Sequence, residues 1–430
     1  MDWTKIPDLL AITALVGAFY SILRREPLNN IELSNSPFAD SRRWLYGWIL
    51  ILVHFAASMG AQSTSTAGFI ARAITLISLV AAAVEFMRAS VLNRNHVSSL
   101  CMTLAVGVPP SIYIFLLLLP SVSGWMFLVT ALFITLGPFM VGLLAPRKLL
   151  VAPRYIVMFL YLALGVILLL AGPPHSQDST LALNAILFTV YLCCCLIFWS
   201  SYRGRTSAGS VITIGGFLAW ALVFVVGPLF QTKFPAIHIE DEVWNLPKYV
   251  VAVGMLLLLL ESQIERSQYL AHHDDLTTLA NRRMFESHMA ECLARCTQSG
   301  KTLGLLQIDL DLFKQVNDKH GHHIGDLLLQ QVAERMRSRI RRGDLLARTG
   351  GDEFSVILTG ADSARDIHAV ADSLLELLHL PFSVGGHTLR IGASVGTAIY
   401  PEDAHDAASL YIAADQRMYQ RKELRRSLSS

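Results

Sequence analysis

Charged residues are scarce in this chain: they make up 16% of its 430 residues, whereas hydrophobic residues make up 53%. Both values depart from those of an ordinary soluble protein. The scarcity is local, since residues 1–261 hold 15 Lys and Arg and 11 Asp and Glu, while residues 262–430 hold 20 and 22. The first segment is therefore predicted to suit a lipid environment, and the second to be a water-soluble domain.

The chain also lacks an excess of one charge sign, and it lacks a metal-binding cluster of cysteines. The formal net charge is +2, and both segments are near neutral, so nothing indicates a nucleic-acid partner. The six cysteines are Cys101, Cys193, Cys194, Cys195, Cys292 and Cys296. No His/Cys cluster completes a zinc site, and buried, inert thiols are predicted. The three consecutive cysteines could hold a metal or redox ligand, but their side chains point in different directions around a helix.

Long apolar runs dominate residues 1–261. About 20 apolar residues are needed for a helix to cross a bilayer. Nine such spans are predicted, near 7–23, 44–61, 67–87, 99–119, 124–145, 151–171, 181–199, 210–230 and 247–261. The first and last are short, so the count is eight or nine. No cleavable signal peptide is evident, because the first run lacks a preceding basic region.

Every second short loop between the predicted spans is rich in basic residues, so these residues gather on one side of the predicted membrane. One set of loops carries Arg24, Arg25, Arg42, Arg43, Arg88, Arg94, Arg147, Lys148, Arg154, Arg203 and Arg205. The intervening loops at 62–66, 120–123 and 172–180 have no Lys or Arg. The positive-inside rule then places the N-terminus outside, and everything after residue 262 in the cytoplasm of an inner-membrane protein.

Some ionisable residues lie inside the predicted spans: Arg72 and Glu85 share one, and His54 lies in another. Such groups are costly in lipid and can mark a site. The simpler interpretation is that Arg72 and Glu85 lie near opposite ends of their helix and reach the headgroups. What the membrane region senses does not follow from the sequence.

The residues after the last span form a linker, 262–272. Leu257, Leu260, Ile264, Ser267 and Ala271 recur at the 3-4 spacing of a short coiled-coil seam. A continuing unpaired helix explains the pattern equally well. Beyond it, helices are predicted at 281–297, 325–340, 363–379 and 406–424, and strands at 303–309, 345–348, 354–358 and 389–399. This mixture predicts an α/β fold in which helices flank one sheet.

Carboxylates end the first of these strands and follow a Gly-Gly turn. Asp309 and Asp311 close the apolar strand, and Gly350-Gly351 precede Asp352 and Glu353. Glycines accept positive φ without steric cost, so a tight hairpin turn is predicted. Carboxylates on two adjacent strands can hold Mg²⁺ together with substrate phosphates. In isolation, acidic residues after such a turn are more often a solvated hairpin.

Five ordered blocks together resemble the GGDEF family over 272–426. They are His273 to Arg283, Asp309 to Asp326, Gly350 to Phe354, Ala393 to Gly396, and Ala414 to Lys422. The resemblance implies a nucleotide-cyclase-like GGDEF domain at 273–426, before a tail at 427–430. It also implies a diguanylate cyclase, a homodimer that condenses two GTP into cyclic di-GMP. Two departures stand out: Thr278 where the family usually has Gly, and Arg425 where Gly usually precedes the last Arg.

The resemblance assigns roles to individual residues. Asp309, the carbonyl of Leu310, Asp352 and Glu353 would hold Mg²⁺ or Mn²⁺, with Asp352 and Glu353 as the catalytic carboxylates. The residues implied in GTP binding are Asn317 and Asp326 for guanine, Phe313, Lys314, Lys422 and Arg426 for the phosphates, and Gly350 and Gly351 for close approach of the backbone. Arg341-Arg-Gly-Asp344 matches the family's RxxD product-inhibition site. Alternatively, Arg337, Arg339, Arg341 and Arg342 form only a basic helix end.

Two other function classes stay open at this stage. The first is a silent receptor that binds GTP or cyclic di-GMP, although such a domain is expected to have lost the metal carboxylates that are present here. The second is a transporter with a regulatory domain, although no internal repeat of the hydropathy pattern is evident. The downstream effectors of cyclic di-GMP do not follow from the sequence.

Overall fold

The chain forms two compact units, residues 1–263 and 264–430. The structure is a computed structural model, and it describes residues 3–24, 41–90, 96–144, 151–171, 178–204, 206–237, 239–360 and 364–429. The predicted topology depends partly on Arg25, Arg94, Arg147, Lys148 and Arg205, which lie outside these ranges.

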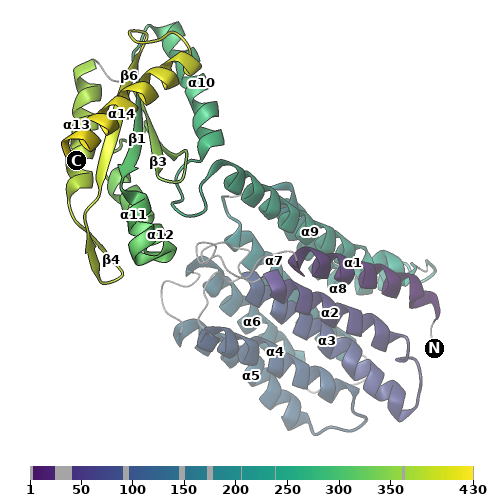
Figure 1. Cartoon of the computed structure of the whole chain (residues 1–430). Coiled ribbons are helices and arrows are strands. Elements are labelled where there is room, and N and C mark those ends of the chain that lie inside the picture. Colours follow the sequence, from purple (N-terminus) through teal and green to yellow (C-terminus); the bar gives the residue numbers. More distant parts are fainter. Residues whose placement is uncertain are drawn as a thin grey trace. The chain divides into compact units, whose positions relative to one another are not determined.

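The first unit is helical throughout its described elements. After a short 3-10 helix, Trp3–Lys5, the described residues form α1 (Ile6–Arg24), α2 (Ser41–Ser58), α3 (Thr66–Ser90), α4 (His96–Leu118), α5 (Gly124–Leu144), α6 (Val151–Ala171), α7 (Asp178–Ser201), α8 (Ala208–Lys233) and α9 (Asp241–His272) (Figure 1). Each of the nine predicted spans coincides with one of these helices. Their helical structure is therefore confirmed.

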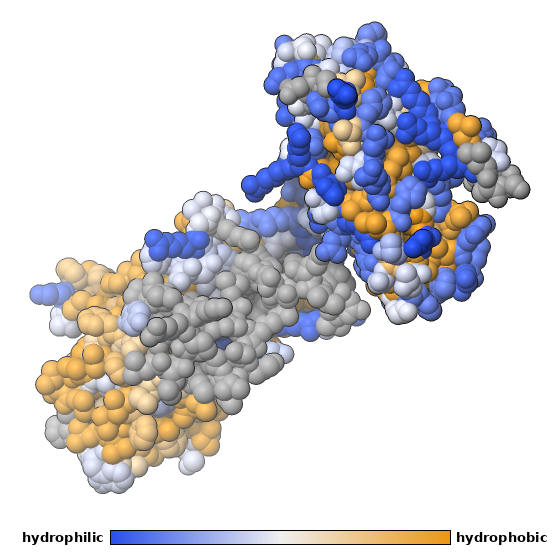
Figure 2. Space-filling model, turned by 90° about the vertical axis from the view of Figure 1, so that its left-hand side faces the viewer, coloured by the Kyte–Doolittle hydropathy of each residue, from blue (hydrophilic) through white to orange (hydrophobic). Residues whose placement is uncertain are grey.

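Hydropathy separates the two units. Among the described residues, five helical stretches are long and apolar enough to cross a membrane: residues 3–24, 66–90, 179–201, 208–233 and 242–272. Shorter apolar helical stretches cover 104–118, 124–140 and 157–170. Figure 2 shows extensive hydrophobic surface on the helical unit and a mostly hydrophilic surface on the second unit. The helices are thus compatible with a membrane region, and the total of nine spans stays a prediction.

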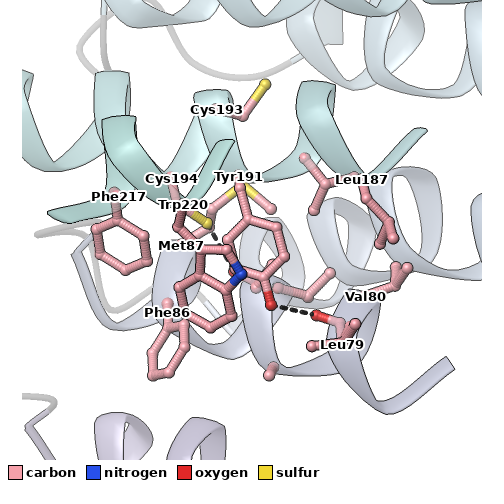
Figure 3. Packing of buried hydrophobic residues seen from close by; sticks show 14 of the residues in the cluster. Leu79, Val80, Phe86, Met87, Leu187, Tyr191, Cys193, Cys194, Phe217 and Trp220 are labelled. Carbon is pink, nitrogen blue, oxygen red and sulfur yellow. Dashed lines mark hydrogen bonds between the residues drawn. The ribbon is translucent and has the colours of Figure 1, made fainter. Parts of the chain in front are cut away.

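Aromatic side chains fill the centre of the helical unit. Trp48, Phe86, Phe217 and Trp220 are almost completely buried, and they come from α2, α3 and α8. Tyr191 of α7 stacks on Trp220 with ring centroids 4.0 Å apart, and its hydroxyl donates to the Leu79 carbonyl at 3.0 Å (Figure 3). Rigid rings from four helices therefore hold the bundle together.

The three consecutive cysteines of α7 point to different neighbours, as predicted. Cys194 Sγ donates to the Ala83 carbonyl on α3, and Cys195 Sγ donates to the Ile214 carbonyl on α8. Figure 3 shows Cys193 directed away from Cys194. All five described cysteines are buried and free, which confirms the predicted burial; the Cys101 side chain lies outside the described set.

Arg72 and Glu85 of α3 lie near its opposite ends. Arg72 donates from Nη1 to the carbonyls of Ala61 and Ser63, both at 2.9 Å, in the loop before the helix. Glu85, close to the other end, accepts from Arg88 at 2.5 Å and lies 3.8 Å from Arg43. The predicted position of the two residues near opposite ends of the helix is confirmed, and each charge is compensated there by protein groups. Their contact with lipid headgroups stays a prediction.

A four-stranded antiparallel sheet forms the second unit, in the order β2-β3-β1-β6. The strands are β1 (Leu303–Asp311), β2 (Leu345–Arg348), β3 (Glu353–Thr359) and β6 (Gly392–Tyr400). Helices α12 (His322–Arg337) and α13 (Ala364–His379) cover one face, and α10 (Arg282–Ser299) and α14 (Ala407–Ser429) cover the other (Figure 1). The predicted sheet flanked by helices is confirmed, with element ends shifted by a few residues.

Two short features were not predicted. Helix α11 (Phe313–His320) follows β1 directly, and a small hairpin pairs β4 (Phe382–Val384) with β5 (His387–Leu389). The predicted strand 389–399 is therefore divided, with its first residue in β5 and most of the rest in β6. With eight residues, α11 is shorter than the window over which apolar periodicity identifies a helix.

Helix α9 runs without interruption from the first unit into the start of the second. It is 32 residues long and ends at His272. Along the proposed seam, Leu260 is 44% exposed and Ile264 is 58% exposed. This apolar face is open in the single chain, and pairing with a second copy stays a prediction.

Candidate active site

Strand pairing brings the predicted metal carboxylates together. Asp309 near the end of β1 lies opposite Glu353 at the start of β3, because the two strands are antiparallel. Directly opposite residues have Cβ atoms about 4.5–5.5 Å apart. Asp352 precedes β3, and its carbonyl accepts from the Leu310 amide at 3.1 Å. The main chain therefore fixes the turn beside β1.

The electrostatics of these carboxylates favour a bound cation. Burial raises the pKa of Asp309, and the nearby charges of Asp352 and Asp311 add to this, while Lys422 opposes it by donating from Nζ to Asp309 Oδ1 at 2.6 Å. Burial also raises the pKa of Glu353, as do the charges of Asp309 and Asp352. Carboxylates that repel one another in a half-buried place are stabilised when a cation neutralises them.

The donor set fits a hard divalent cation. In the described part of the chain, no three His, Cys, Asp or Glu side chains already form a group that could hold a metal. Mg²⁺ does not need such a group, because it is usually bound by one or two carboxylates together with waters and substrate phosphates. Asp309, the Leu310 carbonyl, Asp352 and Glu353 are the residues here that could supply those oxygens.

The glycine pair acts differently from the prediction. The predicted tight turn between β2 and β3 is present, since the amides of Thr349 and Gly350 donate to the Glu353 carbonyl at 3.0 and 3.3 Å. The expected positive φ is wrong, because neither Gly350 nor Gly351 has it. Instead, a Cβ on Gly350 would lie 2.5 Å from Glu353 Oε2, whereas a Cβ on Gly351 would meet nothing within 4 Å. Gly350 thus makes room for the Glu353 carboxylate, and at Gly351 no side chain covers the main chain of the turn.

The first turn of α11 follows the end of β1 directly. Leu312 stands at the N-cap with φ 63° and makes no side-chain cap. Phe313, buried at 9% exposure, and the exposed Lys314 are the first two residues of the helix. Amides at a helix N-terminus attract anions, so this turn suits a phosphate.

Asn317 and Asp326, the predicted guanine contacts, lie on α11 and α12. Asn317 Oδ1 is buried and has no hydrogen-bond partner among the described residues. A Cβ on Gly325 would lie 1.8 Å from this oxygen, so glycine at position 325 leaves room for the Asn317 amide where it lies. Asp326 is exposed on the same helix as Gly325. An orphaned buried acceptor is costly, and a ligand N–H can satisfy it.

Two basic side chains of α14 reach the end of β1. Lys422 contacts Asp309 as described, and Arg425 Nη1 donates to Asp311 Oδ2 at 3.1 Å and to the Ala393 carbonyl at 2.6 Å. Arg425, the departure from the family pattern, therefore ties α14 to the ends of β1 and β6. The side chain of Arg426, predicted to bind phosphate, lies outside the described set.

Arg348 has a positioning role that the sequence did not reveal. Its Nη1 donates to both carboxylate oxygens of Asp274, at 2.9 and 3.2 Å, and its Nη2 donates to the Gly351 carbonyl at 2.8 Å. Asp274 lies two residues after the end of α9. The Arg348 guanidinium thus joins the first residues of the domain, at Asp274, to the glycine turn. The only sequence signal for this role is the position of Arg348 two residues before Gly350.

Arg341 and Asp344 lie in a separate surface pocket. Its volume is about 280 Å³, and its lining includes Thr278, Arg337, Arg341, Arg342 and Asp344. Helix α12 ends at Arg337, so Arg341 lies beyond the helix and the basic-helix-end interpretation loses support. Asp344 Oδ1 accepts from the Thr359 amide at 2.8 Å, which holds its carboxylate in place.

Thr278 carries backbone strain that glycine would remove. Its φ is 57°, in the left-handed region, which costs a non-glycine residue about 1–2 kcal/mol. We expect Thr278→Gly to stabilise the domain by about 1 kcal/mol, since glycine's larger unfolded-state entropy offsets part of the gain. Urea unfolding of residues 262–430 measures this. Thr388→Gly, in strand β5, is the control and should destabilise; a destabilised Thr278→Gly would contradict the argument.

In a comparison with protein-family models, residues 271–427 match the family described as “Diguanylate cyclase, GGDEF domain”. MucR of Pseudomonas aeruginosa, named a bifunctional diguanylate cyclase/cyclic di-GMP phosphodiesterase, is 36% identical over 189 residues, which are 40% of this chain and 27% of that protein. Diguanylate cyclase TpbB of the same species is 40% identical over 150 residues, 35% of this chain and 34% of TpbB. A solved structure comprising only the TpbB GGDEF domain is 39% identical, covering 36% of this chain and 90% of that one, with a TM-score of 0.35. The chain thus spans about a third or less of these two curated relatives.

Proposed function

Residues 271–427 belong to the GGDEF family, and from that premise we propose that this chain is a diguanylate cyclase. The reaction would condense two GTP into cyclic di-GMP and release two pyrophosphates. The observation that carries the proposal is the juxtaposition of Asp309 and Glu353 on paired strands with Asp352 in the turn between β2 and β3. Relatives named diguanylate cyclases support the same activity.

In this proposal, each subunit of a homodimer binds one GTP. Asn317 and Asp326 read the guanine edge, since a carboxylate can accept from the ring N–H and the exocyclic amine, a pairing that adenine does not offer. The amides of Phe313 and Lys314 and the ammonium groups of Lys314 and Lys422 hold the phosphates, as does Arg426. Gly350 and Gly351 let the nucleotide approach the main chain.

The chemical step joins the two bound nucleotides. The 3′-oxygen of one ribose forms a bond to the α-phosphorus of the other GTP, the bond to the bridging oxygen of pyrophosphate breaks, and the 3′-hydroxyl proton leaves. The same exchange in the opposite direction closes the ring. A divalent cation held by Asp309, the Leu310 carbonyl, Asp352 and Glu353 would supply charge stabilisation at the transferring phosphoryl group. The Glu353 carboxylate, opposite Asp309 at the start of β3, would accept the 3′-hydroxyl proton.

The other parts of the chain are proposed to regulate this reaction. Residues 1–261 would form nine membrane spans with the N-terminus outside, as a sensor region. Residues 262–272 would link it to the catalytic domain at 273–426 in the cytoplasm, followed by the tail at 427–430. The exposed face at Leu260 and Ile264 favours pairing of two copies there.

Nucleotide analysis tests the activity directly. The purified chain, and residues 262–430 fused to a dimerising coiled coil, are incubated with GTP and Mg²⁺ or Mn²⁺, and the products are separated by chromatography. Cyclic di-GMP and pyrophosphate are expected in a 1:2 ratio. If the forced dimer binds GTP but makes no product, the domain is a nucleotide-binding module and the cyclase proposal fails.

Product inhibition through Arg341 and Asp344 gives a separate prediction. A bidentate Arg contact contributes about 1.5–3 kcal/mol, so Arg341→Ala should weaken cyclic di-GMP binding roughly 10- to 100-fold. The initial rate should change little, because the pocket does not include the carboxylates of the catalytic turn. Progress curves with added cyclic di-GMP measure this. Equal slowing of the parent and the variant would remove Arg341 from the inhibitory site.

A further inference from the structure

Two histidines from different elements of the second unit lie side by side. His320 is the last residue of α11, and His387 is the first residue of β5. Their ring centroids are 4.9 Å apart, with 52° between the ring planes. His320 is partly buried and His387 is exposed, and among the described residues neither imidazole takes part in a hydrogen bond. The ring nitrogens can therefore bind a ligand from solution.

Helix α12 holds the hairpin that carries one of these histidines. Gly385 and Gly386 have φ of 54° and 82°, and a two-residue hairpin turn of type I′ needs positive φ at both positions. A Cβ on Gly385 would lie 2.5 Å from Ile324 Cδ1, so the turn lies directly on α12. Gln331 of the same helix donates from Nε2 to the Ser383 carbonyl at 2.7 Å. The place of the hairpin, and of the first residue of β5, is therefore fixed by α12.

The same helix holds the end of α11. Gly321 separates α11 from α12, and its amide donates to the Asn317 carbonyl at 2.8 Å. The two helices pack closely, since a Cβ on Gly325 of α12 would lie 1.8 Å from Asn317 Oδ1. Both histidines are thus positioned by one helix. Ligating groups that are already in place bind a metal ion with a smaller loss of conformational entropy.

The separation of the rings matches that of two histidines on one metal ion. With Zn–N bonds of about 2.0–2.1 Å, a zinc ion lies about 3.2 Å from each ring centroid, and at a tetrahedral angle the centroids are then about 5 Å apart. Imidazole nitrogen suits Zn²⁺, Cu²⁺ and Ni²⁺, whereas Mg²⁺ prefers oxygen ligands. In the part of the chain that the structure describes, no third His, Cys, Asp or Glu completes a metal-binding group with this pair. Water molecules would fill the other coordination positions.

We propose that His320 and His387 form a binding site for a transition-metal ion of the Zn²⁺ class. The site differs in chemistry from the proposed Mg²⁺ site, whose ligands are the oxygens of Asp309 and Asp352. A bound ion joins the end of α11 to the β4–β5 hairpin. Because Asn317 lies one turn before His320, the ion also stabilises the helix that carries a predicted guanine contact.

Calorimetric titration of the purified full chain with Zn²⁺ alone, in detergent, tests the site. The buffer is kept at about pH 7.5, because histidine binds a metal only as the neutral imidazole. His320→Gln and His387→Gln should each weaken the Zn²⁺ binding of the parent about 100-fold or more, since loss of a group that only orients a ligand already costs about 10–100-fold. Binding by either variant with the affinity of the parent would reject the site.

Two control variants separate this site from other places where Zn²⁺ could bind. His379→Gln removes an exposed histidine at the end of α13, and Asp352→Asn removes a carboxylate of the proposed Mg²⁺ site. Both should bind Zn²⁺ as the parent does. If Asp352→Asn abolishes binding, Zn²⁺ occupies the carboxylates and the proposal fails. If His379→Gln weakens binding as much as His387→Gln, Zn²⁺ binds scattered surface histidines, which also rejects the site.

Amide hydrogen exchange of the parent gives a second readout that needs no histidine variant. Zn²⁺ at about 100 times its dissociation constant should make opening of the last turn of α11 and of the β4–β5 hairpin about 100-fold less populated. Exchange in α10, on the other face of the sheet, should stay the same. Unchanged exchange in both α11 and the hairpin would overturn the proposal. Neither measurement uses GTP, so the result does not depend on the proposed cyclase activity.

Discussion

Asp352→Ala is expected to reduce cyclic di-GMP formation by about 10³-fold or more while the domain stays folded. The carboxylate is one of the proposed cation ligands, and one positive group at a transferring phosphoryl, an arginine finger, contributes about 10³–10⁵-fold to such reactions. Folding should survive because the turn is held by the main-chain carbonyl of Asp352, which accepts from the Leu310 amide and is retained in alanine.

Initial rates of the parent and the variant, measured across a range of Mg²⁺ concentrations, test this. Asp372→Ala is the matched control, since it removes an exposed carboxylate from α13, and it should keep the parent's rate. Circular dichroism and thermal unfolding should match for all three proteins. Activity of Asp352→Ala within a few-fold of the parent would show that Asp352 does not hold the catalytic cation.

Gly325→Ala is expected to weaken GTP binding sharply, although the substituted residue touches no nucleotide in the proposal. The added Cβ would lie 1.8 Å from Asn317 Oδ1 and 3.3 Å from Phe313 Cζ. The amide must rotate away, since it is the end of a flexible side chain. Losing its contact with guanine leaves a buried polar group unpaired, at about 1–3 kcal/mol, or roughly 5- to 150-fold in affinity.

A double-mutant cycle distinguishes this route from a general distortion. GTP affinity is measured by calorimetry for Gly325→Ala, Asn317→Ala and the double variant. If position 325 acts through Asn317, adding Gly325→Ala to Asn317→Ala should change nothing further. Additive losses would mean that the substitution disturbs the start of α12 rather than the guanine contact.

Much of the catalytic domain could be predicted from local patterns. Apolar runs bounded by turn residues located β1, β2 and β3, and helical periodicity located α10, α12, α13 and α14. The register that places Asp309 opposite Glu353 could not be predicted, because it depends on contacts between segments 44 residues apart. The motif order nevertheless indicated that the two residues meet.

The failures have identifiable physical causes. The Gly350-Gly351 pair suggested positive φ, but the reason for Gly350 is the Glu353 carboxylate beside it, a contact formed only in the folded hairpin. Likewise, the hydrogen bonds that join Asp8 of α1 to Asn245 and Tyr249 of α9 were not predicted. The partners are on different helices, and a window along the sequence contains no information on such pairs.

The ion pair between Lys422 and Asp309 has a consequence for how ligands load. With Lys422 Nζ 2.6 Å from Asp309 Oδ1, the chain itself supplies a counterion for this carboxylate. A divalent cation arriving alone must compete with that ammonium, and its affinity should be low. A triphosphate gives Lys422 another anion to contact, which releases Asp309. Cation and nucleotide should therefore bind with positive heterotropic cooperativity, each raising the other's affinity by the same factor.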